Sequence, residues 1–449
     1  MEQSVAVDGF KVMHWLNARK LTLEAAARTI GIPSDTLNPI TQSESCQFPA
    51  DLVEKLALCL NVEAHQISAD NAASPQIIVM KRREIEATRR AIYRDGIHFY
   101  NYYSLPSPKG KVGPVILDIL CPKGRLPKLN NGHLEPAITV NIGPGDIYGR
   151  WGEDLTDDTW NVLAANKTGR EPWILGDSYT EPSYCRHTYS LVADERAQII
   201  SYTVKSNLEG FLNEANAWSA RAFDTMLEKL CDGPAQASIM TLQMGRRGFS
   251  AETLAETLSL SRNAILGYLA GDSDSLSVAD LRAIGTHLGV DYRLFLPAAQ
   301  NRDRVGKTFC SVANSLSTIR RYQSYTVASM ASAPTESDLV GLFMRVDKSA
   351  CDETPDLTDH GPSHYLTTRG KLSLHVCTDE ERQVIDLEPG DAVWLGPFVP
   401  HAFFGQGALA KLGNGAGSSY LDQIQLSNTF DPRATLKQGR RNLRGWGYD

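Results

Sequence analysis

Apolar residues recur at helical spacing in a stretch near the start of the chain. Between residues 18 and 62 they suit one face of successive helices, with Ala26 among them and a break at Gly31. This spacing predicts a small helix-turn-helix bundle in which Thr22 is an N-cap. A shift of 228 residues reproduces the series, so that Leu254 takes the place of Ala26. We therefore predict that the helical domain occurs twice.

After each helical stretch, the pattern changes to short runs of alternating apolar residues separated by Gly and Pro. Clear runs occupy residues 114–119, 137–140, 198–204, 325–328, 372–376 and 383–387. Such runs are typical of antiparallel β-barrels. The predicted fold class is α+β and multidomain, with two repeats of an all-α helix-turn-helix-like domain followed by a barrel. The predicted domains are 1–75, 76–210, 211–300 and 301–435.

Composition excludes several classes of protein. The chain has 449 residues, of which 42% are hydrophobic and 22% charged, and its net charge is −7. No run of about 18 apolar residues is present, so we expect no membrane span. The N-terminus lacks the pattern of a secretion signal, and we expect a cytoplasmic location. Eight cysteines without a Cys-x-x-Cys pair argue against a disulfide framework and against thiolate zinc.

His133, Glu181 and His187 are the candidate metal ligands. They lie between strand-like segments and offer two imidazoles and one carboxylate. This set holds Fe(II) on one face and leaves the opposite face open to substrate and dioxygen, although Mn, Co and Zn accept the same ligands. A single His in a strand is usually structural, so the prediction depends on the three together. Open positions on the ion favour redox chemistry over hydrolysis.

The glycine-to-histidine spacing of the segment that contains Glu181 and His187 recurs later in the chain. Gly176 and His187 are separated by eleven positions, and so are Gly390 and His401, but Leu395 takes the place of the carboxylate. We expect the second barrel to be a degenerate copy that binds no metal and serves as half of an internal pseudo-dimer. Two further histidines of this barrel, His364 and His375, then have structural roles.

Four residues are candidates for binding an anionic substrate. Arg94 offers a rigid donor fork, and Tyr102 and Asn130 offer neutral donors that orient a ligand. Lys20 lies at the edge of the first helical domain as a mobile cation. Each of the four also has an ordinary interpretation as a solvated or structural side chain.

Two motifs carry a family resemblance. Gly176, Pro182 and His187 match the second sequence motif of cupin barrels, and residues 130–136 precede them. With both helical domains, nearly the whole chain closely resembles the 2-hydroxyethylphosphonate dioxygenases, which are tandem-cupin non-heme iron enzymes. It is also similar to methylphosphonate synthases and hydroxypropylphosphonate epoxidases. The synthases carry Gln where this chain has Glu181, which favours the dioxygenases.

The resemblance implies a specific activity. His133, Glu181 and His187 would hold Fe(II), and Lys20, Arg94, Tyr102 and Asn130 would bind the phosphonate. Dioxygen would cleave the carbon–carbon bond of 2-hydroxyethylphosphonate to give hydroxymethylphosphonate and formate, in antibiotic (phosphonate natural-product) biosynthesis. The chemistry would be centred on the iron, with no separate acid or base residue. No 2-oxoglutarate, NAD or flavin would be needed, and no Gly-x-Gly-x-x-Gly motif follows a strand.

Alternatives remain within and outside this family. A methylphosphonate synthase or another phosphonate oxygenase would use the same ligands. A helix-turn-helix and cupin transcription regulator is the alternative without catalysis. Its recognition segments would be residues 34–38 and 261–265, which contain one basic residue between them. One positive charge is too few for the phosphate contacts of a DNA-binding segment. We therefore expect no nucleic-acid partner, although homo-oligomers are compatible with the sequence.

Overall fold

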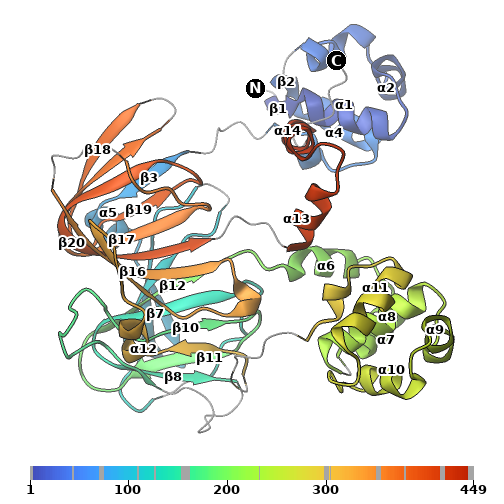
Figure 1. Ribbon diagram of the computed structural model, residues 1–449. Helices are drawn as coiled ribbons and strands as arrows, with labels where there is room; N and C mark the ends of the chain where they lie inside the picture. The colour runs from blue at the N-terminus through green and yellow to red at the C-terminus, as the bar shows by residue number, and fades with distance from the viewer. Residues whose placement is uncertain are drawn as a thin grey trace. The chain divides into compact units, whose positions relative to one another are not determined.

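The computed structural model describes most of the chain and divides it into two compact units. The units are Met1–Pro75 with Gly417–Asp449, and Gln76–Ala416 (Figure 1). The described residues are 4–42, 45–69, 75–108, 111–125, 128–152, 162–231, 233–297, 303, 305–349, 355–378, 381–414 and 420–442. No helix among them is long and apolar enough to cross a membrane.

The first unit is a helical bundle with a two-stranded sheet. Thr22 accepts a hydrogen bond from the Ala25 amide at the start of one helix, and Gly31 ends that helix at a φ of 76°, as the sequence predicts. Ala26 and Leu37 lie in its apolar core. The elements are β1 (Ser4–Asp8), α1 (Gly9–Ala18), α2 (Leu23–Ile30), η1 (Ser34–Leu37), α3 (Pro39–Gln42), β2 (Ser45–Pro49), α4 (Ala50–Leu60), η2 (Ala64–Gln66), α13 (Tyr420–Ser427) and α14 (Pro432–Asn442).

The second unit contains a helical part with similar local signals. Ser250 caps a helix by accepting from the Thr253 amide, and Leu254 and Ile265 lie in the helical core. These residues are the counterparts of Thr22, Ala26 and Leu37 in the predicted repeat. The elements are α6 (Leu208–Ala215), α7 (Ala220–Cys231), α8 (Ala235–Arg246), α9 (Ala251–Leu258), α10 (Arg262–Leu269), α11 (Val278–Leu288) and η3 (Tyr292–Phe295).

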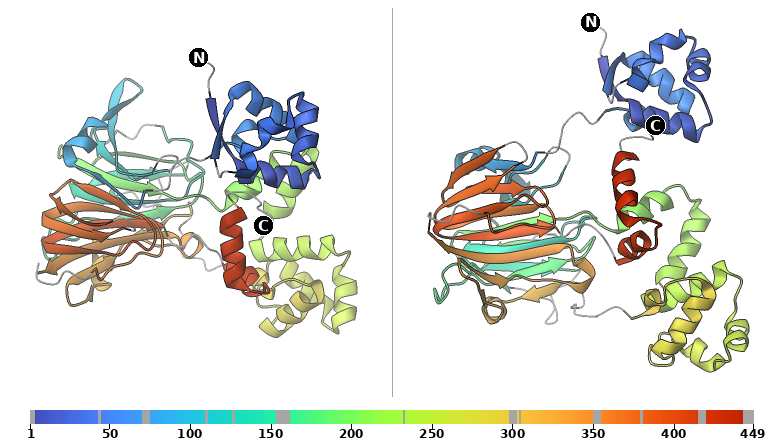
Figure 2. Two further views of the ribbon diagram at one scale, coloured as in Figure 1. Left: turned by 90° about the horizontal axis from the view of Figure 1, so that it is seen from above. Right: turned by 45° about the horizontal axis from the view of Figure 1, so that its top comes forward.

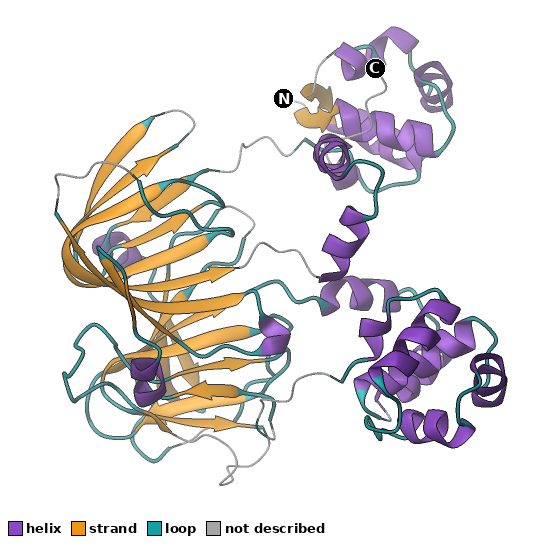
Figure 3. Ribbon diagram, viewed as in Figure 1, coloured by secondary structure: helices purple, strands orange, loops and turns teal. Residues whose placement is uncertain are grey.

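The remainder of this unit consists mainly of antiparallel strands (Figure 3). A seven-stranded sheet has the order β13–β10–β7–β12–β6–β5–β4, and a three-stranded sheet has the order β11–β8–β9. Trp151 and Tyr189 of the smaller sheet pack in one core with Phe99, Leu117 and Ile199 of the larger. The strands are β4 (Arg90–Arg94), β5 (Ile97–Ser104), β6 (Val115–Ile119), β7 (Ala137–Pro144), β8 (Ile147–Trp151), β9 (Val162–Leu163), β10 (Ser178–Glu181), β11 (His187–Leu191), β12 (Ala197–Thr203) and β13 (Thr308–Cys310).

A second large sheet has eight strands in the order β14–β15–β16–β20–β17–β19–β3, with β18 paired to β17. Its strands are β3 (Ile77–Met80), β14 (Arg320–Arg321), β15 (Tyr325–Ser329), β16 (Leu339–Lys348), β17 (Ser363–Cys377), β18 (Arg382–Leu387), β19 (Ala392–Leu395) and β20 (His401–Asn414). The short helices α5 (Arg82–Ala87), α12 (Val312–Ser317) and η4 (Pro334–Glu336) accompany the sheets.

The two large sheets lie against each other (Figure 2) and share an apolar core. Ile138 and Val140 of β7 pack in it with Phe343 of β16 and Leu366 of β17. The alternate residue Thr139 lies on the opposite side of β7, where it bonds Ser201 at 3.1 Å. Because β7 is buried on both faces, its sequence is nearly continuously apolar.

The predicted barrels take the form of facing antiparallel sheets, and no closed ring of paired strands is present among the described residues. The described strand paths run from β13 to β4 in one large sheet and from β14 to β3 in the other. The cores are instead enclosed by facing sheets and by strands that bend. Gly and Pro turns in the sequence reveal antiparallel neighbours, whereas closure depends on the pairing of distant edges.

The sheets also exchange their first strands. β3 follows the first helical bundle in sequence yet pairs with β19, and β13 follows the second helical part yet pairs with β10. Each predicted barrel range therefore contributes a strand to the sheet formed mainly by the other range. Residues 417–435 group with the first unit, although their predicted range is the second barrel.

Candidate metal centre

Three neighbouring backbone segments bring His133, Glu181 and His187 together. His133 precedes β7, Glu181 is the last residue of β10 and His187 is the first residue of β11. β10 pairs with β7 so that Glu181 lies opposite Ala137. The turn between β10 and β11 then returns the chain, and places the second imidazole beside the carboxylate.

The ligand atoms of these residues lie close enough to share an ion. One nitrogen or oxygen from each residue lies within 4.8 Å of the others, and within the described part of the chain this is the one such group. His133 Nε2 is 3.5 Å from Glu181 Oε1. Glu181 is 2% exposed, and its Oε2 accepts no hydrogen bond. A buried carboxylate oxygen without a donor is well suited to a cation.

Both imidazoles have the same orientation relative to their own backbone. Nδ1 of His133 lies 2.5 Å from the Glu135 carbonyl, and Nδ1 of His187 lies 3.0 Å from the Cys185 carbonyl. In His187, Nδ1 also lies 3.4 Å from Glu181 Oε2, and Nε2 accepts a hydrogen bond from Asn130. Because a carbonyl can only accept, each Nδ1 carries the hydrogen. This arrangement is the usual one for metal-bound histidine. The hydrogen bond to Glu181, opposed in part by burial, raises the pKa of His133.

Asn130 is fixed directly beside the ligands. Its Oδ1 accepts from the Gly132 amide at 3.1 Å and from the His187 amide at 2.9 Å. Its Nδ2 therefore points inward and donates to His187 Nε2 at 3.0 Å. The predicted substrate residue thus presents a polar group at the position where a ligand of the ion would lie.

Gly132 allows the two ligand-bearing loops to meet. It has a φ of 72°, and an added Cβ would lie 2.5 Å from the Tyr184 backbone carbon. The next residue, His133, accepts a hydrogen bond at its carbonyl from the Tyr184 amide at 2.6 Å. A side chain at position 132 would separate the loop of His133 from the turn that leads to His187.

Arg94 and Tyr102 belong to a chain of aromatic side chains that reaches the ligands. The Arg94 guanidinium lies 5.8 Å from the centre of the Tyr100 ring, and Tyr102 packs edge-on against the same ring at 5.9 Å. The Tyr100 hydroxyl accepts from the Tyr189 amide at 3.0 Å, and the Tyr189 ring lies 5.6 Å from that of His187. Burial raises the pKa of Tyr102 despite Arg94, so the phenol remains a neutral donor.

Lys20 lies in the other unit. It follows α1 as an exposed residue in a left-handed turn, with a φ of 57°, and its amide bonds the Asn17 carbonyl. The predicted substrate residues therefore divide between the units, with Arg94, Tyr102 and Asn130 in one and Lys20 in the other.

Sequence reasoning missed a buried ion pair beside the centre. Lys307 is 1% exposed, is paired with Asp303 and lies 5.0 Å from the centre of the Trp151 ring. The preceding residues contact the ligand turn, because the Cys185 thiol bonds the Val305 carbonyl at 3.7 Å. A lysine before a short strand gives no sequence signal of burial. It also missed a buried pair of phenols, Tyr179 and Tyr189, whose hydroxyls are hydrogen-bonded.

The second large sheet lacks such a ligand group among its described residues. His401 is fully buried and bonds the Tyr365 hydroxyl at 3.1 Å. His364 is buried against Tyr202 of the first large sheet, with 4.9 Å between the ring centres. His375 packs on Phe404 at 4.3 Å. Each of these three histidines therefore has an aromatic packing or hydrogen-bonding partner in the structure.

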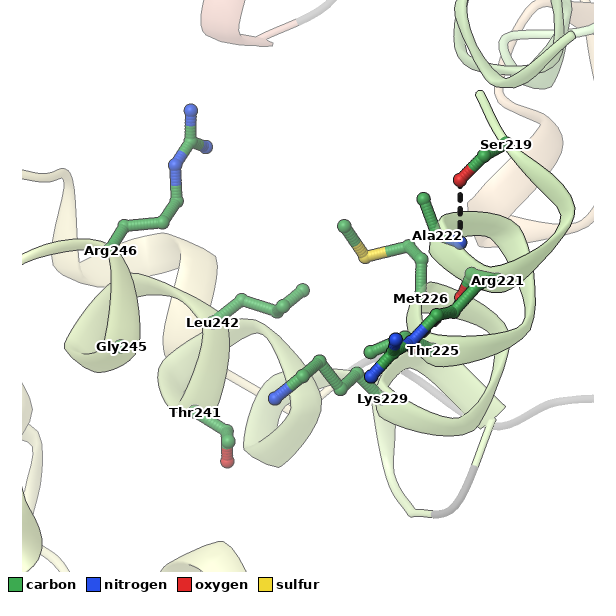
Figure 4. Close-up of a pocket in the computed structure, with 10 residues that line it drawn as sticks. All are labelled: Ser219, Arg221, Ala222, Thr225, Met226, Lys229, Thr241, Leu242, Gly245 and Arg246. Atoms are coloured by element: carbon green, nitrogen blue, oxygen red, sulfur yellow. Dashed lines mark hydrogen bonds between the residues drawn. The ribbon is translucent and has the colours of Figure 1, made fainter. Parts of the chain in front are cut away.

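A hollow in the helical part of the same unit has a different character. It has a volume of about 660 Å³, and Figure 4 shows Arg221 and Lys229 of α7 and Arg246 of α8 around Met226 and Leu242. None of its lining residues is His, Cys, Asp or Glu. The hollow therefore offers no side chains that prefer a divalent cation.

Comparison with known proteins identifies similar chains. Residues 86–204 match the family model described as the 2-hydroxyethylphosphonate dioxygenase cupin-like domain. The 2-hydroxyethylphosphonate dioxygenase of Streptomyces viridochromogenes is 46% identical over 443 residues, which are 99% of this chain and 99% of that one. The methylphosphonate synthase of Nitrosopumilus maritimus is 23% identical over 92% of this chain and 90% of its own.

A similar solved structure is that of PhpD with cadmium, complexed with hydroethylphosphonate (HEP). It has a TM-score of 0.81 and 44% sequence identity, and the alignment covers 97% of this chain and all of that one. The similarity therefore extends across the helical segments as well as the sheets.

Proposed function

Because this chain belongs to the 2-hydroxyethylphosphonate dioxygenase family, we propose that one Fe(II) is held by His133, Glu181 and His187. The protein uses dioxygen to cleave the carbon–carbon bond of 2-hydroxyethylphosphonate, giving hydroxymethylphosphonate and formate. The two reactants contain all the atoms of the two products. No 2-oxoglutarate, nicotinamide or flavin is required, because the substrate supplies every electron that dioxygen accepts.

The observation that carries this proposal is the convergence of the three ligand side chains. Two imidazoles, each with Nδ1 beside a backbone carbonyl, and one buried carboxylate would supply three ligands and leave the other positions of an octahedral ion open. When bound, Fe(II) supplies the one-electron chemistry that dioxygen requires and that Zn or Cd cannot supply. The family activity therefore selects iron from the ions that fit these ligands.

The side chains around the ligands bind and orient the phosphonate. Asn130 presents its amide beside His187, and Tyr102 presents a phenol that burial keeps protonated. Arg94, next to the same aromatic cluster, supplies a cationic fork for phosphonate oxygens. Lys20 adds a second cation from the other unit. Orientation of this kind is the main contribution of the protein, because the reactive chemistry belongs to the cofactor.

The architecture around this centre is a duplication. We propose that the first helical bundle with the metal-bearing sheets, and the second helical part with the degenerate sheet, are two copies of one helix-turn-helix and cupin unit. Matching caps at Thr22 and Ser250 support this interpretation. The degenerate copy then forms an internal pseudo-dimer with the metal-bearing copy through their shared apolar core.

We further propose a cytoplasmic enzyme of phosphonate natural-product synthesis that binds no nucleic acid. The seven described cysteines form no disulfide, as expected in a reducing compartment. Arg262, the one basic residue of the recognition-like segments, is paired with Glu252. This pairing neutralises a charge that a DNA-binding regulator would need for phosphate contacts.

Oxygen uptake tests this proposal. Protein loaded anaerobically with Fe(II) is mixed with 2-hydroxyethylphosphonate and then with a measured amount of dioxygen. We expect one dioxygen to be consumed for each substrate without added 2-oxoglutarate. Ethylphosphonate, which lacks the hydroxyl group, is the matched control and gives no sustained uptake. Uptake that requires 2-oxoglutarate, or none at all with iron bound, contradicts the proposal.

A further inference from the structure

The second large sheet repeats the strand pairing that builds the metal centre. Glu181 at the end of β10 lies opposite Ala137 of β7, and Leu395 at the end of β19 lies opposite Ser363 of β17. On the other side, β7 pairs with β12 and β17 pairs with β20. This register gives each residue of the metal centre a defined counterpart in the second large sheet.

One counterpart is a histidine in the orientation of a metal ligand. His401 follows Leu395 by six positions, which is also the spacing from Glu181 to His187. Its Nδ1 lies 2.9 Å from the Val399 carbonyl, two residues back, as in the first centre. The ring therefore keeps Nε2 directed toward the buried Tyr365 hydroxyl, although no ligand trio lies there in the described part of the sheet.

A second counterpart is a carboxylate that is already neutralised. Asp359 precedes Ser363 by four positions, as His133 precedes the residue opposite Glu181. One oxygen of Asp359 is bonded to the Lys411 ammonium, and the other accepts from the Tyr365 hydroxyl at 2.6 Å. Burial opposes ionisation, yet Lys411 and Tyr365 hold the pKa of Asp359 below its usual range.

The lysine itself occupies a position that is neutral in the first centre. Tyr365 lies opposite Lys411, and at the equivalent register Thr139 lies opposite Ser201. The side chain of Lys411 is 15% exposed and that of Asp359 11% exposed, whereas that of His401 is fully buried. A positive charge has therefore been introduced at the place where the first centre has a serine.

We propose that the Lys411 ammonium is a built-in cation that replaces the divalent metal in the second large sheet. His401 and Asp359 are then the remnants of a latent metal site, which Lys411 keeps closed. The site would accept a divalent transition metal such as Fe(II) once the ammonium is removed and a carboxylate is restored at position 395. This inference rests on the proposed metal assignment in the first centre.

Electrostatic repulsion explains why a divalent ion and the Lys411 ammonium exclude each other. A buried carboxylate without a partner is strongly destabilising, so loss of the metal requires another positive charge beside Asp359. Lys411 supplies that charge from β20, and its four-carbon chain reaches inward from the strand. A divalent ion bound between Asp359 and His401 would lie close to the ammonium, and their repulsion in a low-dielectric core would prevent binding.

Iron stoichiometry tests the inference. Wild-type protein and a Leu395→Glu/Lys411→Ser variant are loaded anaerobically with Fe(II), desalted and analysed by mass spectrometry of the metal. We expect one iron per chain in the wild type and two in the variant. Leu395→Glu alone, which retains the lysine, is the matched control and binds one. Adding His187→Ala removes the first iron and leaves one in the double-variant background.

One iron per chain in a double variant that retains wild-type turnover overturns the inference. An absence of iron from the wild type overturns the first-site assignment and this inference with it. If the double variant does not fold, thermal unfolding of Lys411→Met tests whether the ammonium neutralises Asp359. We expect a lower melting temperature that Asp359→Asn restores when the two changes are combined. An unchanged melting temperature in Lys411→Met shows that the ammonium does not neutralise Asp359.

Discussion

Two imidazole rings of the metal centre are oriented by their own backbone. His133 and His187 each donate Nδ1–H to a carbonyl two residues away, so an ion would bind at Nε2, which in His187 accepts a hydrogen bond from Asn130 at 3.0 Å. Metal and proton compete for that nitrogen. The pKa of His133 is raised. Protons therefore begin to compete with the metal for this imidazole at a higher pH than they would for an ordinary imidazole. Iron affinity therefore falls as the pH falls through this raised pKa.

Removing either imidazole should remove the metal. We expect His133→Ala and His187→Ala to lose most bound iron and nearly all turnover, because two remaining ligands leave an incomplete site. His401→Ala is the matched control and should still bind one iron. Metal analysis and oxygen uptake measure both effects. Full iron occupancy in either of the first two variants would mean that the centre lies elsewhere.

Glu181 is the anionic member of the proposed ligand set. We expect Glu181→Gln to lower turnover by at least about tenfold, because a neutral amide no longer offsets the charge of the metal. Part of the remaining turnover should give methylphosphonate, because the resemblance to methylphosphonate synthases implies Gln at this position in enzymes that make this product. Phosphorus NMR of the products measures both outcomes. An unchanged rate with hydroxymethylphosphonate alone would show that Glu181 does not bind the iron.

His364 makes stability depend on pH. Burial lowers its pKa to about 3 from the usual 6.5, so the unfolded chain binds the proton more tightly than the folded chain. The stability is complete above pH 6.5 and is lost progressively as the pH falls toward the folded value. Between pH 7 and pH 5 we expect a loss of about 2 kcal/mol from this residue.

His364→Phe removes the titration while keeping an aromatic ring against Tyr202. Urea unfolding at the two pH values, followed by tryptophan fluorescence, compares the variant with the wild type. The wild type should lose more stability on acidification. Equal losses in the two proteins would mean that His364 is not held neutral by burial.

At the scale of the elements, the exchanged strand β13 connects the metal centre with the segment that follows the second helical part. It pairs with β10, the strand that ends at Glu181. Just before it, the Asp303 carboxylate accepts from the amides of Val305 and Lys307 and pairs with the Lys307 ammonium. A turn and a buried charge are thus stabilised by one side chain.

Asp303→Asn separates these two roles, because Asn keeps the acceptor for both amides but loses the charge. The buried ammonium of Lys307 is then unpaired. We expect a loss of about 2–3 kcal/mol in unfolding free energy, reduced from the fully buried case because Asp303 is partly exposed. Urea unfolding measures it. Adding Lys307→Met should recover most of the loss, and its failure to do so would contradict a charge-pairing role.

At the scale of the whole molecule, the two large sheets form one body through a shared core, and the first helical bundle forms a separate unit. Lys20, the fourth predicted substrate residue, lies in the bundle, and the three predicted metal ligands lie in the unit that contains the sheets.

Lys20→Ala tests whether the first unit contributes to substrate binding. We expect KM for 2-hydroxyethylphosphonate to rise by about tenfold or more, with iron content unchanged, because an ionic hydrogen bond to the phosphonate is lost. Lys55→Ala, which removes a surface lysine of the same unit that pairs with Asp51, is the matched control. An unchanged KM would leave Lys20 as an ordinary solvated lysine.

The sequence predicted the local features of this molecule better than its long-range pairings. The caps Thr22 and Gly31 were predicted because their signals lie within one turn of the helix. Glu181 and His187 were predicted as a pair because the segment from Gly176 to His187 is continuous in sequence, and His133 was added from the upstream residues 130–136. Nothing local indicates that β13 pairs with β10, or that Lys307 is buried. The proposed role of Lys411 depends on the strand register, which aligns it with Ser201.

The most direct test of the central claim is the product of a single anaerobic preparation exposed to oxygen. Protein with one Fe(II) is incubated with carbon-13-labelled 2-hydroxyethylphosphonate, and the products are identified by phosphorus and carbon NMR. The account predicts equal amounts of hydroxymethylphosphonate and formate, and neither product from His187→Ala. Methylphosphonate with carbon dioxide from the wild-type protein, or unchanged substrate despite bound iron, would contradict it.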